Sequence, residues 1–331
     1  MKRIGNLFPL ITDFKNLYTA FKRAFQGSNR TEESMSFHFH MEEELLKLQR
    51  ELRKKSYKPG QYRHFKIYDP KERTISVAPF RDRVVHHSII NIIEPIYEKT
   101  FIYDSYATRK DKGTHKAILR TQAFLRNNKW FLKADIKKYF ESVDHALLIE
   151  IVKRRIKDKD TIELLEAIIR NGGKEDKGLP IGNLTSQFLA NVFLDPFDHC
   201  IKEQLMVKCY VRYMDDFVIL SDDKGFLKDI RLGIDDYLTN HLGLKLNTNV
   251  VMINQRANGL SFLGSRIYPN LLRIKKESLK RCMGKMQQKI KEWESGHIPE
   301  QHLLMSLNSI NGYLSFFDSY MLRRKIFWGK G

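Results

Sequence analysis

Two adjacent aspartates lie between two strongly apolar segments and limit how this part of the chain can fold. Within residues 209–220 they follow Tyr213 and Met214, and both flanks are rich in β-branched and aromatic residues. Such flanks predict two antiparallel strands joined by a tight turn that carries Asp215 and Asp216 at its tip. Two carboxylates beside so much apolar surface are costly unless a cation compensates them. An ordinary acidic turn is the alternative for this pair alone.

A third aspartate occupies a matching place earlier in the chain. Residues 130–134 form an apolar, strand-like run that ends at Asp135, and a helix is expected to begin near Ser142 or Asp144. If two neighbouring strands place Asp135 beside Asp215, their carboxylates could hold two metal ions about 3.5–4 Å apart. The hard ion Mg²⁺ prefers carboxylate and phosphate oxygens, and Mn²⁺ can substitute for it. The pattern therefore favours two-metal phosphoryl transfer.

A segment broken by glycine and proline, residues 178–194, lies between these acids. An apolar-periodic helix is predicted to begin within it, near Thr185. Taken in order, Asp135 with its following aromatics, this segment and the residues 213–216 resemble motifs A, B and C of reverse transcriptases. The resemblance implies an RNA-directed DNA polymerase, that is, a nucleotidyltransferase that binds a template RNA and a cDNA–RNA duplex and uses dNTPs.

Two residue pairs in the glycine segment indicate which type of reverse transcriptase the chain resembles. Its Ile181-Gly182 and Ser186-Gln187 pairs form an Ile-Gly-x-x-x-Ser-Gln pattern. This pattern is similar to that of reverse transcriptases from diversity-generating retroelements, whereas most group II intron and retroviral relatives carry Gln-Gly at this loop. The subtype implies copying with errors at adenines, rewriting of a target gene by the cDNA, and a small basic accessory protein as a partner. Retron and group II intron-derived reverse transcriptases are the main alternative.

Further matches indicate which residues surround the nucleotide. Lys66 and Arg73 match residues that hold the triphosphate in the family, a role suited to an ammonium and a guanidinium. Phe140 lies five residues after Asp135, where an aromatic ring under the sugar would clash with a ribose 2′-OH. Tyr139 is the alternative for that role. The resemblance implies these nucleotide-binding residues: Lys66, Arg73, Phe140, Ile181, Gly182 and Gln187.

The C-terminal part carries two more matches. Residues 262–264 resemble the primer grip, a turn that packs against the primer strand, and comprise Phe262, Leu263 and Gly264. Residues 273–291 are strongly basic, which suits a helix that lies along a nucleic-acid backbone. The backbone contacts expected there are Lys275, Lys276, Lys280 and Arg281. Many relatives have a motif D lysine where this chain has residues 247–250 without one, so the general acid is unassigned, with Lys245 as a candidate.

These motifs, in this order, imply an α+β fold of the right-hand polymerase type, with fingers, a palm built on an antiparallel sheet, and a helical thumb. We expect N-terminal helices and fingers over 1–110, a palm over 111–268 with a fingers insertion at about 146–180, and a thumb over 269–331. By the resemblance, the catalytic acids Asp135, Asp215 and Asp216 work with two Mg²⁺ ions. Asp135, Asp215 and the Ile136 carbonyl would bind them, and Asp216 would touch metal only indirectly.

The charge balance is consistent with a polyanionic partner. The chain has 58 Lys and Arg against 39 Asp and Glu, a net charge of +19 that favours binding to nucleic acid. Asp13 and Lys15 interrupt the apolar N-terminal stretch, and no apolar run reaches the length of a membrane span. The three cysteines show no Cys-x-x-Cys spacing. We therefore expect no membrane association and a cytoplasmic protein encoded by a bacterium, an archaeon or a phage.

Two other functions would share parts of this pattern. A non-catalytic RNA-binding protein of the intron-maturase type would have the same charge and fold, and the three intact acids argue against it. An RNA-dependent RNA polymerase would have a similar palm, and the aromatic residue at Phe140 argues against it. The sequence therefore favours reverse transcription over both alternatives.

Overall fold

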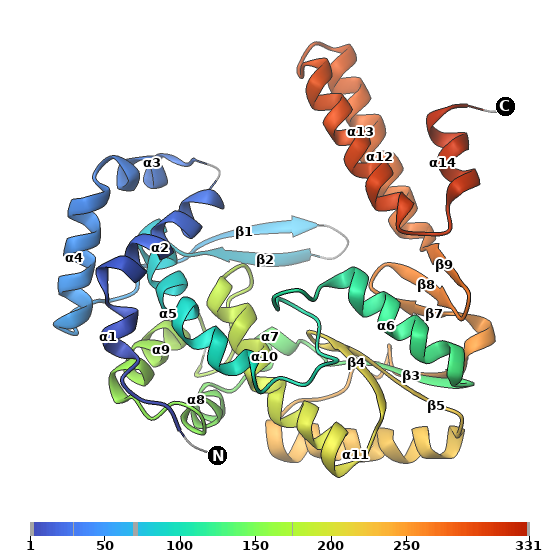
Figure 1. The fold of residues 1–331 in the computed structure, drawn as a ribbon, viewed down its shortest axis with the longest axis horizontal. Helices are drawn as coiled ribbons and strands as arrows, with labels where there is room; N and C mark the ends of the chain where they lie inside the picture. Colours follow the sequence, from blue (N-terminus) through green and yellow to red (C-terminus); the bar gives the residue numbers. More distant parts are fainter. Residues whose placement is uncertain (1–2, 29, 69–71, 174, 330–331) are drawn as a thin grey trace.

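Aspartate and threonine side chains cap several helices in the N-terminal part of the chain. Asp13 caps α2 (Phe14–Gln26) by accepting hydrogen bonds from two backbone amides. Asp158 caps α9 (Lys159–Gly172) and also accepts from the Leu7 amide at 2.6 Å, which fastens the N-terminal segment to this helix. The computed structural model describes residues 3–28, 30–68, 72–173 and 175–329 (Figure 1). Other helices in this part of the chain are α1 (Phe8–Ile11), α3 (Glu32–Phe39), α4 (Met41–Arg53), α5 (Phe80–Glu98) and α8 (His145–Lys153).

A two-stranded hairpin projects from these helices. β1 (Arg63–Tyr68) and β2 (Glu72–Val77) pair antiparallel, and most of their side chains are exposed. The base of the hairpin is anchored where the Ser76 amide donates to the Ile181 carbonyl at 2.8 Å. In Figure 1 the hairpin extends from the N-terminal helices toward α12 (Lys276–Glu294).

The centre of the molecule is a four-stranded antiparallel sheet with the strand order β4–β5–β3–β6. Along β5, Phe217 and Ile219 join the larger hydrophobic core, whereas Val218 and Leu220 join a smaller one. Successive side chains of a strand point to opposite faces, so the sheet is buried on both sides. This double burial explains why its strands are continuous apolar runs. The strands are β3 (Trp130–Asp135), β4 (Cys209–Tyr213), β5 (Asp216–Ser221) and β6 (Met252–Gln255).

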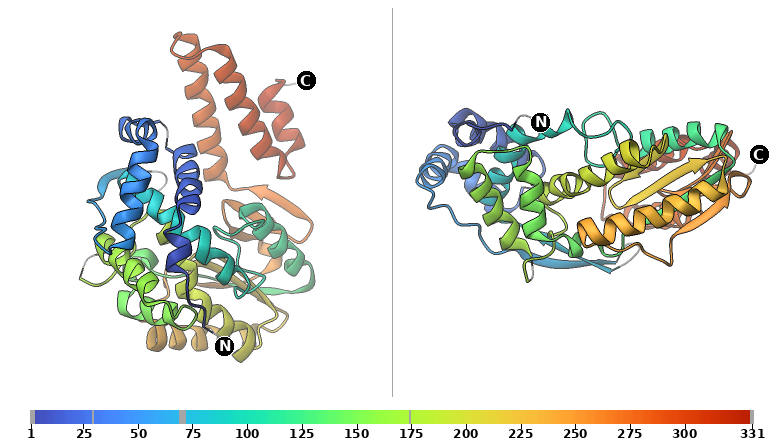
Figure 2. Two further views of the ribbon diagram at one scale, coloured as in Figure 1. Left: turned by 60° about the vertical axis from the view of Figure 1, so that its left-hand side comes forward. Right: turned by 90° about the horizontal axis from the view of Figure 1, so that it is seen from below.

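Helices cover both faces of this sheet (Figures 1 and 2). On one face, α6 (Thr114–Asn127) contributes Ala117, Ile118 and Leu125 to the smaller core. On the other face, α11 (Lys224–Leu242) and α10 (Leu184–His199) contribute to the larger core. The short elements of this region are α7 (Tyr139–Ser142) after β3 and the π-helical turn η1 (Cys200–Gln204) after α10.

A second antiparallel sheet, of three strands, leads into the C-terminal helices. Its last strand, β9, is separated from α12 by a single residue, Lys275. α12 packs against α13, and Figures 1 and 2 show these helices standing away from the rest of the molecule. The elements are η2 (Arg256–Asn258), β7 (Leu260–Phe262), β8 (Ser265–Tyr268), β9 (Leu271–Ile274), α13 (Glu300–Ser315) and α14 (Tyr320–Phe327).

The α+β architecture with antiparallel sheets confirms the expected class. The helix predicted near Ser142 or Asp144 is α8, and Asp144 caps it by accepting from the Leu147 amide at 3.0 Å. β9 lies inside the range 269–331 that was expected to be helical, because pairing with β8 buries Leu272 in the smaller core. Within the described ranges, no helix is both long and apolar enough to cross a membrane.

Candidate active site

The three predicted acids meet at one end of the central sheet. β3 and β5 pair so that Asp135 lies opposite Asp216. Asp215 lies beside them in a two-residue loop with Met214, because Tyr213 pairs with Asp216. Met214 has a φ of 58°, a left-handed conformation of the kind that two-residue hairpin loops require. The predicted hairpin is therefore confirmed, with Asp216 on the strand rather than in the turn.

Hydrogen bonds join the two acidic segments to each other and to a third one. The Ile136 amide donates to the Asp215 carbonyl at 3.2 Å. The Asn247 amide donates to the Asp135 carbonyl at 2.8 Å, and Asn247 Nδ2 donates to Asp135 Oδ1 at 3.1 Å. Asn247 lies where the motif D lysine of the family was sought, and nothing in the sequence pointed to its contact with Asp135.

Burial and mutual repulsion make two of these acids difficult to ionise. Burial raises the pKa of Asp215 to about 6, the Asp135 charge adds to this rise, and Arg73 opposes it. Burial also raises the pKa of Asp216 to about 6, against the opposing effect of Lys133. A bound divalent cation would remove this cost, because it favours the ionised carboxylates.

A buried oxygen without a partner also fits a cation. Asp216 Oδ1 is buried and has no hydrogen-bond partner among the described residues, since Lys133 Nζ lies 3.6 Å away, within ion-pair range only. Among the residues that the structure describes, no three His, Cys, Asp or Glu side chains form a ready-made metal cluster. Mg²⁺ commonly binds through one or two carboxylates and completes its shell with water and substrate phosphates. The donors present therefore fit a metal site that the substrate completes.

The glycine segment packs against the base of the β1–β2 hairpin. In addition to the Ser76–Ile181 backbone bond, Asn183 Nδ2 donates to the Ser76 carbonyl at 3.0 Å. Gly182 has a φ of 113°, and a Cβ added there would lie 2.8 Å from the Ile75 side chain. This position therefore requires glycine, both for its backbone conformation and for the close approach of the hairpin. Ile181 itself is half-buried.

Two aromatic residues follow Asp135 in different environments. Tyr139 is buried, and its hydroxyl donates to the Ala190 carbonyl of α10. Phe140 is only half-buried, and its carbonyl accepts from the Leu179 amide at 2.7 Å, so the glycine segment lies against it. Of these two residues, only Phe140 is partly exposed. Gln187, in the first turn of α10, is also half-buried.

The β1–β2 hairpin carries the two residues predicted to hold the triphosphate, and it places them on opposite faces. Lys66 is opposite Thr74, and Arg73 is the neighbour of Thr74 on the same strand. Directly opposed residues share a face and successive residues alternate, so Lys66 and Arg73 point to opposite faces of the hairpin. Lys66 Nζ pairs with Glu72 at 2.6 Å, whereas the charge of Arg73 acts on Asp215. The structure therefore brings Arg73, but not Lys66, toward the acids.

The predicted primer-grip turn is a tight hairpin between β7 and β8. Leu263 and Gly264 form its two-residue loop, with φ values of 46° and 78°, as a type I′ turn requires. The Lys275 amide donates to the Gly264 carbonyl at 3.1 Å, which ties the turn to the start of α12. The Phe262 side chain is fully buried in the smaller core. Phe262 therefore supports the turn from the core, and Leu263 and Gly264 form the turn itself.

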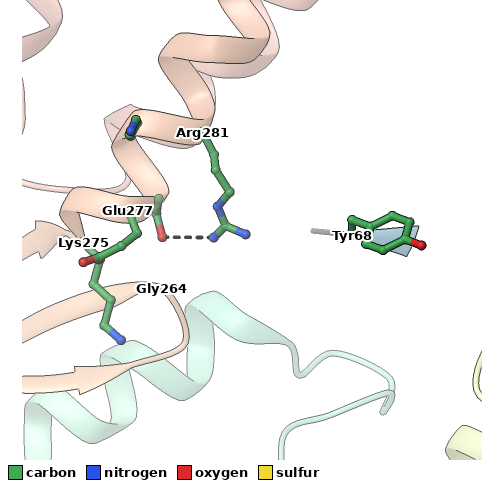
Figure 3. A pocket seen from close by; sticks show the side chains of 7 residues that line it. Tyr68, Gly264, Lys275, Glu277 and Arg281 are labelled. Carbon is green, nitrogen blue, oxygen red and sulfur yellow. Dashed lines mark hydrogen bonds between the residues drawn. The ribbon is translucent and has the colours of Figure 1, made fainter. Parts of the chain in front are cut away.

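A cavity of about 780 Å³ lies between the hairpin and the base of α12. Figure 3 shows Tyr68 on the hairpin side and Lys275 and Arg281 on the helix side. Lys275 is half-buried: burial and the Lys133 charge lower its pKa, and Asp216 opposes this effect. Lys275 therefore lies close enough to Asp216 for their charges to interact. The exposed members of the predicted set are Lys276, Lys280 and Arg281.

Sequence reasoning missed Arg212, which is fully buried next to the acidic turn. Its Nη1 donates to the Met214 carbonyl at 2.9 Å, and its Nε and Nη2 donate to the two carboxylate oxygens of Asp198 at 2.7 and 2.6 Å. The available signal was an arginine inside an otherwise apolar strand. Such a charge is costly to bury unless it is paired, so its presence indicates a partner.

Comparisons with protein families and known proteins show what this chain is similar to. The family model described as reverse transcriptase (RNA-dependent DNA polymerase) matches residues 53–267. Protein YkfC of Escherichia coli K12 is 28% identical over 272 residues, which cover 68% of this chain and 71% of YkfC. The group II intron-encoded protein LtrA of Lactococcus lactis is 27% identical over 175 residues, which cover 50% of this chain and 29% of LtrA. A solved structure of apo telomerase from Candida tropicalis aligns with a TM-score of 0.49 at 13% identity, over 70% of this chain and 52% of the telomerase.

The share of each relative's length that this chain covers differs between the two relatives. The chain spans most of the length of YkfC but less than a third of LtrA. The stretch matched by the family model contains the β1–β2 hairpin, the glycine segment and all three acids. Because that stretch is well over half of the chain, this protein belongs to the reverse transcriptase (RNA-dependent DNA polymerase) family.

Proposed function

We propose that this protein copies a template RNA into cDNA by two-metal nucleotidyl transfer from dNTPs. The observation that carries this proposal is the convergence of Asp135, Asp215 and Asp216 at one sheet end. Family membership implies divalent-metal use. Asp135, Asp215 and the Ile136 carbonyl would hold two Mg²⁺ or Mn²⁺ ions, which would activate the primer 3′-OH and stabilise charge on the triphosphate.

The protein's own groups have distinct roles in this proposal. Asp216 acts mainly through its charge, because Lys133 already lies at ion-pair distance from it. Arg73 neutralises the triphosphate, and its electrostatic effect on Asp215 supports this placement. Phe140 limits the space under the sugar and thereby selects dNTPs. Lys66 would join the triphosphate only after leaving Glu72, so its role depends on movement of the hairpin.

The arrangement of elements supports an assignment of regions. We assign residues 1–110 to N-terminal helices and fingers, with the β1–β2 hairpin as the fingertip. Residues 111–268 form the palm around the four-stranded sheet, with α8 and α9 in the inserted stretch at about 146–180. Residues 269–331 form the thumb, which begins with β9 and continues into α12 and α13. A duplex bound between hairpin and thumb would pass the cavity in Figure 3.

We also propose that the enzyme is of the diversity-generating retroelement type and miscopies template adenines with the help of a small basic accessory protein. The Ile-Gly-x-x-x-Ser-Gln pattern supports this subtype. Ile181 lies on the glycine segment, and its apolar side chain cannot donate a hydrogen bond to a nascent base pair. The intron-encoded relative LtrA favours a second candidate, a group II intron-derived or retron reverse transcriptase that copies without this bias.

Primer extension on a defined RNA template tests the activity. Wild-type protein with Mg²⁺ should extend a DNA primer, and Asp135→Asn or Asp215→Asn should abolish extension while RNA binding stays nearly intact. Asp229→Asn, which changes an exposed carboxylate on α11, is the matched control and should extend normally. Substantial extension by both site variants would refute the assignment of the acids. Sequencing the cDNA then separates the subtypes, since a retroelement enzyme should show errors concentrated at template adenines.

A further inference from the structure

Arg212 is a fully buried arginine whose every donor is used. Its guanidinium carries five N–H groups, and five hydrogen bonds are present. Two go to the carboxylate of Asp198 and one goes to the Met214 carbonyl. The remaining two go to Asn191 Oδ1 at 3.1 Å and Ser105 Oγ at 3.2 Å. One side chain thus connects three segments that are far apart in the sequence.

A contribution to folding stability alone would not explain the buried ion pair between Arg212 and Asp198. Replacing a buried ion pair by apolar side chains of similar volume is often neutral or stabilising, because the desolvation cost disappears with the charges. The neighbours Val211 on the same strand and Phe217 opposite Arg212 are apolar and buried. An apolar residue would therefore suit position 212 as far as the core is concerned. An apolar residue could not replace the contacts to Asn191, Ser105 and the Met214 carbonyl, and of these only the last reaches the acidic turn.

That carbonyl belongs to the peptide that precedes Asp215. Arg212 Nη1 holds it at 2.9 Å, and the Ile136 amide holds the carbonyl of Asp215 itself at 3.2 Å. The peptides on both sides of Asp215 are therefore fixed in orientation, and so is the direction in which its carboxylate leaves the backbone. This matters because Met214 has a left-handed φ of 58°, which a residue with a side chain adopts only when its surroundings impose it.

The same guanidinium connects the turn to α10. Asn191 and Asp198 both lie on this helix, whose first turn lies within the glycine segment. Asn191 Nδ2 also donates to the Ala107 carbonyl at 2.7 Å. The Arg212 amide donates to the Asp104 carbonyl, and the Arg212 carbonyl accepts from the Tyr106 amide. Displacement of α10 would therefore move the Met214 carbonyl through a chain of short, direct contacts.

We propose that Arg212 is the positioning residue that sets the orientation of the Asp215 carboxylate and links it to α10. This inference rests on the proposed function, in which Asp215 holds the metal ions. A displacement of about 1 Å at a reacting group can reduce a rate by about 10²-fold. Removal of the Arg212 guanidinium should therefore lower kcat by about that factor and weaken metal binding, while the KM for dNTPs changes little.

The test removes the charges without leaving one of them unpaired. In a triple variant, Arg212→Met and Asp198→Leu delete the pair, and Tyr210→Phe deletes the hydroxyl that donates to Asp198 at 2.7 Å. The matched control is Arg109→Met with Glu98→Leu. Arg109 is also buried and makes a two-pronged contact with Glu98, but it holds carbonyls of residues 102 and 105 rather than of the acidic turn.

Three quantities are measured on each protein: the midpoint of urea unfolding, kcat and KM for single-nucleotide addition, and Mn²⁺ binding to the metal-free protein by electron paramagnetic resonance. We expect both variants to stay folded and to unfold at a comparably reduced urea concentration, because each leaves carbonyl groups without the arginine that donated to them. Only the triple variant should lose about 10²-fold in kcat and bind Mn²⁺ about tenfold more weakly. Wild-type kcat and Mn²⁺ affinity in a folded triple variant would overturn the inference.

A second variant decides the case in which the triple variant fails to fold. Arg212→Lys keeps a positive charge beside Asp198 but has three donors instead of five. A folded lysine variant with reduced kcat and Mn²⁺ affinity supports the inference, and one with wild-type values overturns it. Unfolding of both variants would make Arg212 a residue of the fold and would also overturn it. Absence of nucleotide addition by the wild-type protein would instead reject the proposed function.

Discussion

Replacing Asp215 by asparagine should stabilise the metal-free protein while it abolishes polymerisation. Asp215 is half-buried near Asp135 and Asp216; burial and the Asp135 charge oppose its ionisation, and the charges of Asp135 and Asp215 oppose that of Asp216. Asparagine has nearly the same shape, carries no charge and cannot bridge two metal ions. The variant therefore removes the repulsion that metal binding relieves in the wild type. Stability and activity should change in opposite directions, as is common where a site is assembled for function.

The magnitude follows from the raised pKa. A rise from 3.8 to about 6 corresponds to a cost of about 3 kcal/mol for ionising Asp215 in the folded protein. For a carboxyl with a raised folded-state pKa, this cost is present above about pH 6 and vanishes below about pH 4, where both folded and unfolded states are protonated. We therefore expect Asp215→Asn to gain about 1–3 kcal/mol at pH 7.5 and progressively less as the pH falls from 6 to 4.

Urea unfolding followed by circular dichroism measures this gain, with EDTA present and at several pH values. Asp229→Asn, the exposed control, should unfold like the wild type at each pH. Adding Mn²⁺ or Mg²⁺ at pH 7.5 should stabilise the wild type and should stabilise Asp215→Asn much less. An Asp215→Asn midpoint at or below that of the wild type at pH 7.5 in EDTA would refute the argument that these acids are held against their repulsion.

Three further predictions concern substrate choice, nucleic-acid binding and fidelity. Phe140→Ala should admit rNTPs and leave dNTP use comparatively unharmed in primer extension; unchanged discrimination would place the sugar gate elsewhere, with Tyr139 as the alternative. Neutralising Lys276, Lys280 and Arg281 together should lower the slope of log affinity against log salt for a template–primer by about 0.7–0.9 for each phosphate that the protein no longer neutralises. An unchanged slope in a fluorescence-anisotropy titration would mean that these residues do not bind phosphates. Ile181→Gln should lower misincorporation at template adenines more than at other bases, since shape alone discriminates by about 1–3 kcal/mol; equal adenine error rates in deep-sequenced cDNA, with the accessory protein present, would contradict it.

The acidic hairpin and its partner strand could be predicted because their signals are local. Asp135 and the residues 213–216 each adjoin an apolar run, and such runs form buried strands that end where polar residues begin. The structure pairs these strand ends, with Asp135 opposite Asp216. The helix cap at Asp144 and the helical start at Leu184 were predictable for the same reason, because capping and chain-breaking residues act within one turn.

Other features could not be predicted, because they depend on which face of an element is covered. Lys66 and Arg73 are both cationic residues of the β1–β2 hairpin, yet the strand register places their side chains on opposite faces of the hairpin. Phe262 matched a primer-contact motif, but packing against α6 and the C-terminal helices buries its side chain. Lys275 belongs to a basic stretch, yet it is half-buried beside Lys133 because the turn at Gly264 holds its backbone.

The sequence by itself determined the kind of chemistry, because carboxylates, glycines and apolar runs carry their chemical and conformational limits wherever they are placed. It also determined the order of the elements that hold them. Only the tertiary structure decided how the acids are oriented, through contacts between side chains that are distant along the chain. Arg212 shows the reason: its five hydrogen bonds reach Ser105, Asn191, Asp198 and Met214. Hydrogen bonds act over about 3 Å, so such a set exists only after folding has brought these partners together.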